Sequence, residues 1–217
     1  LFTLDSLNSL VRPGVPLSEN LLEQESLRST AFFRANGYYD FTKGSFTFEA
    51  DTLSGNGKAQ LNYTITPYTT NKYTFGKVSF SVPEGLKFRE SVLQEMNTVV
   101  PGTPYNDTEV NRTYSRLASL RVFNNVTIQT RPVDSLEVDC DVTLMRSKTK
   151  GVRVNLEGSA TTTGLFGITP QMTFYHKNIF HGGEWFNLGF SGSFQSKPKE
   201  GAVSCFVAVW NTGEIPR

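Results

Sequence analysis

The feature that most constrains this chain is an internal repeat. When the sequence is compared with itself at an offset of 88 residues without gaps, identical residues coincide at several positions. The first copies are Val11, Pro13, Gly14, Pro16 and Asn36, and the second copies are Val99, Pro101, Gly102, Pro104 and Asn124. A repeat of this kind predicts that one supersecondary unit occurs twice.

Each copy contains a Pro-Gly-x-Pro turn between two helical segments. The two prolines fix φ on either side of a glycine that tolerates positive φ, so the segment has to turn. We expect short helical turns at 4–10 and 88–97, and longer helices from Ser18 to about 36 and from 107 to 121. Asn106 and Glu109 form a capping-box pattern at the start of the last helix. The residues that predict its apolar face are Val110, Tyr114, Leu117 and Leu120.

Strands are predicted around these helices. The first copy has 45–52 and 59–65, joined by a Gly-rich turn at 54–57. The second copy has an opening strand at 73–82, followed after its helices by 124–131 and 136–145. In the last of these, Val138, Cys140 and Val142 alternate with acidic residues, which predicts one buried face. The offset places the opening strand of the first copy before Leu1, so the predicted unit is β-α-α-β-β, twice.

Three two-faced strands are predicted in the C-terminal third, at 151–160, 166–175 and 186–194, with a further strand at 203–209. One face carries Val152, Val154, Leu156, Phe166, Ile168, Met172, Phe174, Phe186, Leu188, Phe190 and Phe194. The other face is polar and rich in small residues. This pattern is typical of transmembrane β-barrel strands. A soluble β-sandwich is an alternative interpretation, because alternation alone does not distinguish a face that contacts lipid from one that contacts a protein core.

Two motifs show a resemblance to known proteins. The element order, the Pro-Gly-x-Pro turn and the segment Arg34-Ala-Asn-Gly-Tyr-Tyr-Asp-Phe41 resemble the POTRA domain, a periplasmic module. The segment Leu120-Arg-Val-Phe-Asn-Asn-Val126 resembles the ending of that domain, with Arg121 and Val122 where glycine is common. Asn178-Ile-Phe-His-Gly-Gly-Glu184 is similar to the turn after the second barrel strand in the BamA and TamA group of outer-membrane assembly factors.

The resemblance implies an α+β fold with three parts: POTRA modules at 1–68 and 72–147, and the first antiparallel strands of a transmembrane β-barrel at 150–217. It implies a factor in the bacterial outer membrane whose periplasmic modules bind unfolded outer-membrane protein clients and whose barrel promotes their insertion. Outer-membrane lipid and accessory assembly subunits are further expected partners. The alternatives are a two-partner-type secretion transporter and a soluble β-rich binding module without a membrane role.

Binding is expected to occur by addition of a client strand to an exposed sheet edge, because main-chain hydrogen bonds accept many sequences. We predict that the accepting edge is the second strand of the second module, which is short, polar on one side and apolar at Val126 and Ile128 on the other. Its residues are Asn124, Asn125, Val126, Thr127, Ile128, Gln129, Thr130 and Arg131.

Several other functions receive no support from the sequence. The net charge is +1 and the basic residues are scattered, so a nucleic-acid partner is not expected. No catalytic set or phosphate-binding loop has a supporting context, and neither an enzyme activity, a cofactor nor a metal is predicted. His176, His181 and Glu184 straddle a predicted turn and are interpreted as turn residues rather than metal ligands. Cys140 and Cys205 are interpreted as buried thiols rather than a disulfide.

Overall fold

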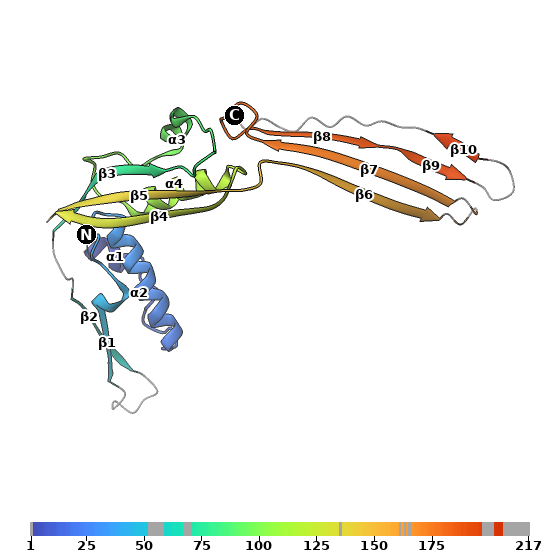
Figure 1. Ribbon diagram of the computed structural model, residues 1–217. Coiled ribbons are helices and arrows are strands. Elements are labelled where there is room, and N and C mark those ends of the chain that lie inside the picture. Colours follow the sequence, from blue (N-terminus) through green and yellow to red (C-terminus); the bar gives the residue numbers. More distant parts are fainter. Residues whose placement is uncertain are drawn as a thin grey trace. The chain divides into compact units, whose positions relative to one another are not determined.

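The computed structural model describes residues 2–51, 59–66, 71–134, 136–160, 162, 164, 166–196 and 202–205. Two compact units make up the chain. The first comprises Leu1–Ser79, Asn97–Ser115 and Ile128–Val142, and the second comprises Phe80–Met96, Arg116–Thr127 and Thr143–Arg217. These limits differ from the module boundaries expected from the sequence, which stay a prediction. Helices and antiparallel sheets are both present, as Figure 1 shows, so the α+β class is confirmed.

The first repeat contains α1 (Phe2–Leu7), α2 (Glu19–Arg34), a 3-10 turn η1 (Lys43–Ser45), and the antiparallel strands β1 (Phe46–Asp51) and β2 (Gln60–Ile65). The Oγ of Ser18 accepts the N–H of Leu21 at 3.2 Å and caps α2 as predicted. Gly14, in the Pro-Gly-x-Pro turn, has a φ of 89°. The predicted turn at 54–57 lies outside the described residues.

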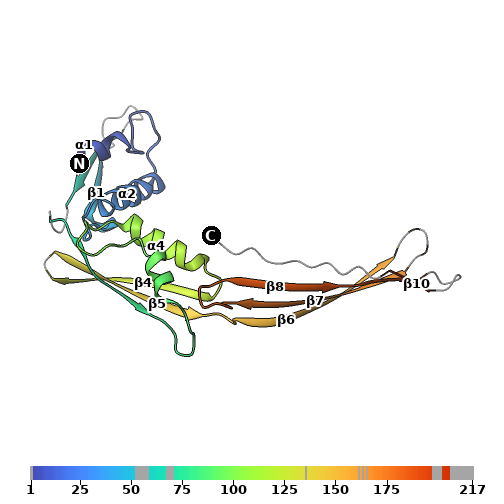
Figure 2. The ribbon, with the colours of Figure 1, turned by 90° about the horizontal axis from the view of Figure 1, so that it is seen from above.

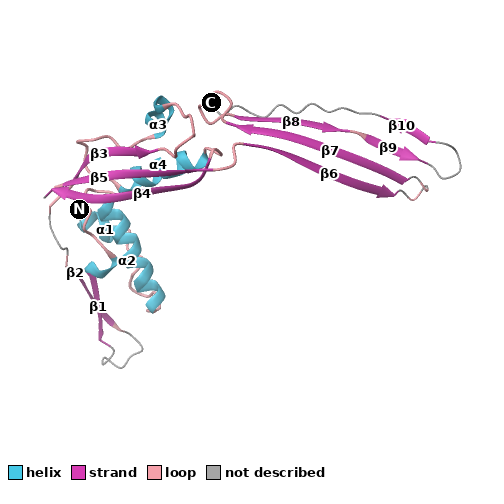
Figure 3. Ribbon diagram, in the orientation of Figure 1, coloured by secondary structure: helices cyan, strands magenta, loops and turns pink. Residues whose placement is uncertain are grey.

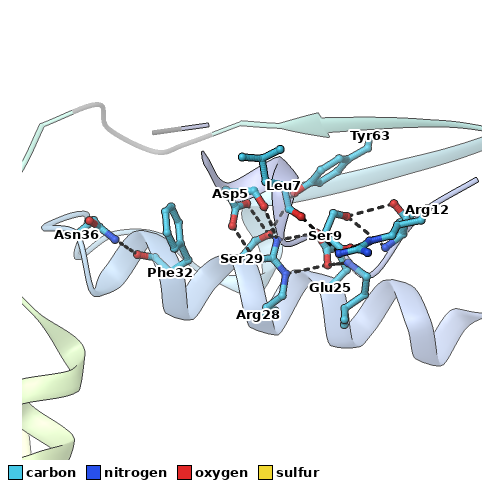
Figure 4. A network of polar contacts seen from close by, with 12 residues as sticks. Asp5, Leu7, Ser9, Arg12, Glu25, Arg28, Ser29, Phe32, Asn36 and Tyr63 are labelled. Carbon is cyan, nitrogen blue, oxygen red and sulfur yellow. Dashed lines mark hydrogen bonds and ion pairs between the residues drawn. The ribbon is translucent and has the colours of Figure 1, made fainter. Parts of the chain in front are cut away.

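The α2 helix buries polar side chains against α1. Arg28 donates to Asp5 at 2.7 Å and to Glu25 at 2.8 Å, and Ser29 donates to Asp5 at 2.9 Å (Figure 4). The side chains of Asp5 and Glu25 are both buried. Apolar packing lies on the other side of the repeat, around Phe33, Phe41 and Phe46. Ion pairs and hydrogen bonds of buried side chains therefore join α1 to α2.

The second repeat contains β3 (Thr74–Ser81), α3 (Glu90–Met96), α4 (Asp107–Ser119), β4 (Phe123–Asp134) and β5 (Glu137–Arg146). Its sheet has the order β3-β5-β4. Hydrogen bonds join Thr74 to Leu136, Lys77 to Asp139 and Ser79 to Asp141, always 62 residues apart. Because a constant offset requires both strands to run in the same direction, β3 and β5 are parallel.

The core of this repeat joins the sheet to α4 and to the segment before it. Its buried members are Tyr73, Phe75, Val99, Tyr105, Val110, Val138 and Cys140. The predicted face of α4 is wrong at Tyr114, which is 46% exposed. Thr113 is buried in its place, because its hydroxyl accepts the N–H of Thr98 at 3.0 Å. Half of the predicted capping box is present: the Oδ1 of Asn106 accepts the N–H of Thr108 at 2.9 Å, whereas the carboxylate of Glu109 pairs with Arg112.

The remaining strands are β6 (Lys150–Ala160), β7 (Phe166–Lys177), β8 (Trp185–Ser191), β9 (Ser193–Ser196) and β10 (Ala202–Cys205). Figures 1 and 2 agree that β6, β7 and β8 lie side by side, and each neighbouring pair is antiparallel. After Ser119 the described part of the chain contains strands but no helix (Figure 3). None of the described helices is long and apolar enough to cross a membrane.

The strand predicted at 186–194 is interrupted, and β8 and β9 are its two parts. Gln171 pairs with Ser191 and Ile168 with Phe194, so the register against β7 is the same on both sides of the break. At the break, Gly192 donates its N–H to the carbonyl of Pro170 at 3.0 Å. Proline has no N–H to return, so the ladder loses one hydrogen bond there.

Candidate functional site

The predicted client-binding residues, Asn124 to Arg131, all lie in β4, at one edge of the three-stranded sheet. Among the described strands, β4 pairs with β5 and with no other. The strand is 12 residues long, Phe123–Asp134, so the expectation of a short strand was wrong. The strand extends beyond the predicted range by Phe123 at its start and by Pro132, Val133 and Asp134 at its end.

The two faces of β4 differ as predicted. The side chain of Val126 is buried and that of Ile128 is half-buried against the core of the repeat. Asn124, Asn125, Thr127 and Gln129 are exposed. The buried face packs β4 against the core. An added strand can therefore bind the main chain of β4 along the edge away from β5.

The edge lacks the usual protection against strand addition. Exposed edges are commonly blocked by charged side chains or proline. From Asn124 to Thr130 the strand carries neither, and the first such residues are Arg131 and Pro132. Arg131 also lies 3.8 Å from Asp141, on the neighbouring strand. The N-terminal half of β4 is therefore an uncharged template of main-chain groups.

The opposite edge of the sheet is partly covered by the chain itself. Phe75 N donates to Thr103 O at 2.8 Å, Gly102 N donates to Phe75 O at 2.7 Å, and Tyr105 N donates to Tyr73 O at 2.8 Å. The second Pro-Gly-x-Pro turn, together with Tyr105, thus occupies the N-terminal end of β3. Of the two edges, β4 is the better candidate for strand addition.

Arg34, the last residue of α2, and Tyr39, in the segment after it, join the two repeats within the first compact unit. The Tyr39 ring lies 5.6 Å from Tyr73 and 5.0 Å from Tyr105, centroid to centroid. Its hydroxyl donates to the carbonyl of Thr130, in β4, at 2.9 Å. Arg34 donates to Tyr39 O at 2.7 Å and to Tyr105 Oη at 2.9 Å. Burial of Tyr105 raises the pKa of its hydroxyl and keeps it protonated.

These roles of Arg34 and Tyr39 were missed at the level of sequence. Both residues belong to a motif that was recognised, but the motif does not say that they contact the other repeat. Thr130 is 91 residues from Tyr39. The only available signal was the density of tyrosines around the motif.

A second candidate site is the apolar face of β6, β7 and β8. Cross-strand register aligns Val152 with Phe174 and Leu188, and Val154 with Met172 and Phe190. Val152 and Val154 are exposed despite their apolar character. The same alignment places Arg153 beside Thr173 and Gly189 on the opposite face. Within the described chain, nothing buries this apolar face.

The turn at 178–184 is built from its own side chains and from the loop before α3, within the second compact unit. Asn178 donates to Lys87 O at 2.8 Å and accepts from Gly183 N at 3.0 Å. Arg89 pairs with Glu184 at 2.9 Å, and its N–H donates to His181 O at 2.8 Å. The motif thus fixes the end of β7 and the start of β8 to that loop.

Glu184 is committed to this turn. Burial alone would raise the pKa of its carboxyl, but backbone N–H groups, including those of Gly182 and Phe180, and the charge of Arg89 outweigh it and hold the pKa below its ordinary value. In the described chain, no group of three or more His, Cys, Asp or Glu side chains is arranged to hold a metal ion. Cys140 is buried, and the side chain of Cys205 lies outside what the structure describes.

Comparisons with known proteins identify the fold. No protein-family model matches the chain, and no curated protein sequence matches it. Among solved structures, it is similar to BamA from Haemophilus ducreyi lacking POTRA domains 1–3, with a TM-score of 0.59 and 18% identity over 88% of this chain and 34% of that one. CdiB from Acinetobacter baumannii gives a TM-score of 0.51 and 14% identity, again over 88% and 34%.

A third similar structure is POTRA3-5 of Haemophilus influenzae BamA, with a TM-score of 0.51 and 19% identity over 67% of this chain and 55% of that one. These likenesses show a shared fold: the chain folds like BamA, a protein with POTRA domains, and like CdiB. The resemblance seen in the sequence is confirmed at that level. The chain spans about a third of the BamA and CdiB chains to which it is similar.

Proposed function

We propose that this chain is part of a bacterial outer-membrane protein-assembly factor. Its two repeats act as POTRA modules in the periplasm and bind unfolded outer-membrane clients along β4. The strands from β6 onward open a transmembrane β-barrel that promotes client insertion. No catalytic step is part of this proposal.

The observation that carries the proposal is the edge of β4 from Asn124 to Gln129, which is uncharged and pairs with no described strand other than β5. An added strand would find alternating N–H and C=O groups there, and these bind a main chain whatever its side chains are. Ser147 N donates to Val122 O at 2.8 Å, which joins the residue before β4 to the residue after β5. N–H groups point alternately to the two sides of a strand, and we predict that the N–H of Thr127 points away from β5.

The membrane part of the proposal is supported by the exposed apolar face of β6 to β8. In a soluble sandwich that face would be covered by a second sheet. In a membrane barrel it would contact lipid, and the polar face would line the interior. The share of the chain matched also falls from 88% to 67% when the similar structure contains POTRA domains alone.

A secretion transporter is the second candidate. The fold is shared with CdiB as well as with BamA, over the same share of this chain. Fold alone therefore does not select between assembly of many clients and export of one partner. The two functions differ in client range, so competition between unrelated unfolded barrel proteins for the chain separates them.

The test is a Thr127→Pro variant, which removes the N–H expected to bind a client strand. A labelled outer-membrane barrel protein, diluted from urea, serves as the probe, and its affinity is measured by fluorescence anisotropy. We expect at least about a tenfold loss of affinity with an unchanged circular dichroism spectrum. Thr127→Val keeps the N–H and should bind as the parent does. Unchanged binding by a folded Thr127→Pro protein would remove β4 as the accepting edge.

A further inference from the structure

A concentrated group of cations lies where the second repeat ends and β6 begins. A cavity of about 330 Å³ is lined by five consecutive residues: Arg146, Ser147, Lys148, Thr149 and Lys150. None of the five is acidic. Within the described part of the chain, Arg146, Lys148 and Lys150 form no ion pair. The chain as a whole carries a net charge of only +1, so this local excess is not a general property of its surface.

Lys177, the last residue of β7, holds this loop in place. Its Nζ donates to Ser147 Oγ at 3.2 Å, and its N–H donates to Thr149 O at 2.6 Å. The end of β7 is thereby fixed to the loop that lines the cavity. Ser147 Oγ also donates to Arg121 O at 3.0 Å, which holds the loop from a second side. The cations are thus presented on a segment that hydrogen bonds keep in place.

The position of Lys150 relates the cations to the apolar face. Lys150 is the first residue of β6, and side chains two apart on a strand share a face, so it continues the row of Val152, Val154 and Leu156. Val152 is about 7 Å further along the strand, at a rise of about 3.3 Å per residue. A ligand with a phosphate at the cavity would therefore have the exposed apolar face directly beside it.

Aromatic side chains accompany the cations at this end of the strands. Trp185 is paired with Lys177 on the opposite, polar face, where the guanidinium of Arg121 lies 3.8 Å from its ring centroid. Phe186 faces His176, which in turn faces Lys150. Aromatic and basic residues at the end of an apolar band are the combination found at membrane interfaces.

We propose that Arg146, Lys148 and Lys150 bind the phosphate of an anionic phospholipid headgroup, with the acyl chains lying along the apolar face of β6 and β7. This inference rests on the proposed membrane role of these strands and specifies one lipid contact within it. The attraction of each cation to an anionic surface is modest, but the three act on the same small area.

The test uses two variants of the full 217-residue chain with equal charge. The first is Arg146→Gln/Lys148→Gln/Lys150→Gln. The second, as a control, is Lys77→Gln/Arg112→Gln/Arg116→Gln, which alters three exposed cations elsewhere. Both lower the net charge from +1 to −2. Sedimentation measures binding to vesicles of phosphatidylcholine alone and of phosphatidylcholine with about 30 mol% phosphatidylglycerol.

We expect the gain in affinity that phosphatidylglycerol provides to fall at least about tenfold in the first variant and less than about twofold in the control. Excess inorganic phosphate at constant ionic strength should leave vesicle binding unchanged. Equal losses in both variants would mean that net charge alone attracts the chain, and the site would be withdrawn. Displacement by inorganic phosphate would make it a site for the free ion and would overturn the lipid assignment.

Client binding is measured on the same variants with the urea-diluted probe. We expect the first variant to bind the client as the parent chain does, because its substitutions lie outside β4. Failure of the lipid site is thus seen in the vesicle assay, and failure of the proposed function is seen in the client assay.

Discussion

Strands β5 and β6 follow each other in the chain and have the same alternating sequence pattern, but their apolar faces have opposite surroundings. In β5, Val138 and Val142 are at most 1% exposed. In β6, Val154 and Leu156 are about 70% exposed. The difference lies in what covers each face. The core of the second repeat covers β5, and no described element covers β6. Alternation therefore specifies a two-faced strand, and the surroundings decide whether the apolar face becomes a core.

The difference in burial between the two apolar faces is tested most directly by placing a carboxylate in each strand. Val142→Asp should destabilise the second repeat by at least about 4 kcal/mol, because an unpaired charge would be buried. Val154→Asp should change the free energy of unfolding by less than about 0.5 kcal/mol in the absence of lipid. Urea unfolding followed by circular dichroism measures both. If Val154→Asp were as costly as Val142→Asp, β6 would have a covered face after all.

A second prediction compares the loss of a buried ion pair with the loss of an exposed one. Arg28→Met leaves the buried carboxylates of Asp5 and Glu25 without their cation, and should cost about 3 to 5 kcal/mol. Lys43→Met is the control, since it breaks only the exposed pair with Glu23 and should cost less than about 1 kcal/mol. Thermal unfolding of both variants is the measurement. Similar costs would show that the ionic network does not hold α1 to α2.

The reaction rates of cysteine thiols in β5 and β6 provide a third comparison of the two apolar faces. Burial, with the nearby charges of Asp139 and Asp141, raises the pKa of Cys140 to about 11. In a Cys205→Ser background, Cys140 should react with a disulfide reagent at pH 8 more than about a hundredfold more slowly than a cysteine introduced by Val154→Cys. Comparable rates in the folded protein would contradict the assignment of covered and uncovered faces.

The smallest effect is expected at the turn that follows β7. Because the pKa of Glu184 lies below its ordinary value of 4.5, the ionised carboxylate stabilises the turn fully above pH 4.5 and loses this contribution as the pH falls through the lower folded-state pKa. Glu184→Gln should lower stability by about 1 kcal/mol near pH 7. The difference in Tm from the parent should shrink below pH 4.5. A difference that did not depend on pH would show that the charge of Glu184 has no role.

Much of the fold was predictable because local signals and packing agree. The two Pro-Gly-x-Pro turns, the cap at Ser18 and the alternation in β5 each specify their own structure. The buried position of Glu25 had no such signal, because its environment depends on Asp5, on another helix. The break after Ser191 could not be located from its own sequence. Its cause is Pro170, which lies opposite the break in the neighbouring strand, and only the register of the two strands shows this.

The candidate site was predictable to a similar extent. The sequence identified the edge strand through its polar face and its position after α4, but the length of β4 depends on pairing with β5. The cations at 146–150 are visible in the sequence as scattered basic residues. Their significance depends on Lys177, which the antiparallel strands bring back to the same end.

The Tyr39 contact has a consequence for how the repeats unfold. Its ring belongs to the first repeat by sequence but packs against the core of the second, beside Tyr73 and Tyr105. Loss of the first repeat would therefore leave a cavity in its neighbour, and each repeat is stabilised by the folded state of the other. We expect the pair to melt in a single cooperative transition, so that a protease cut between them would weaken both.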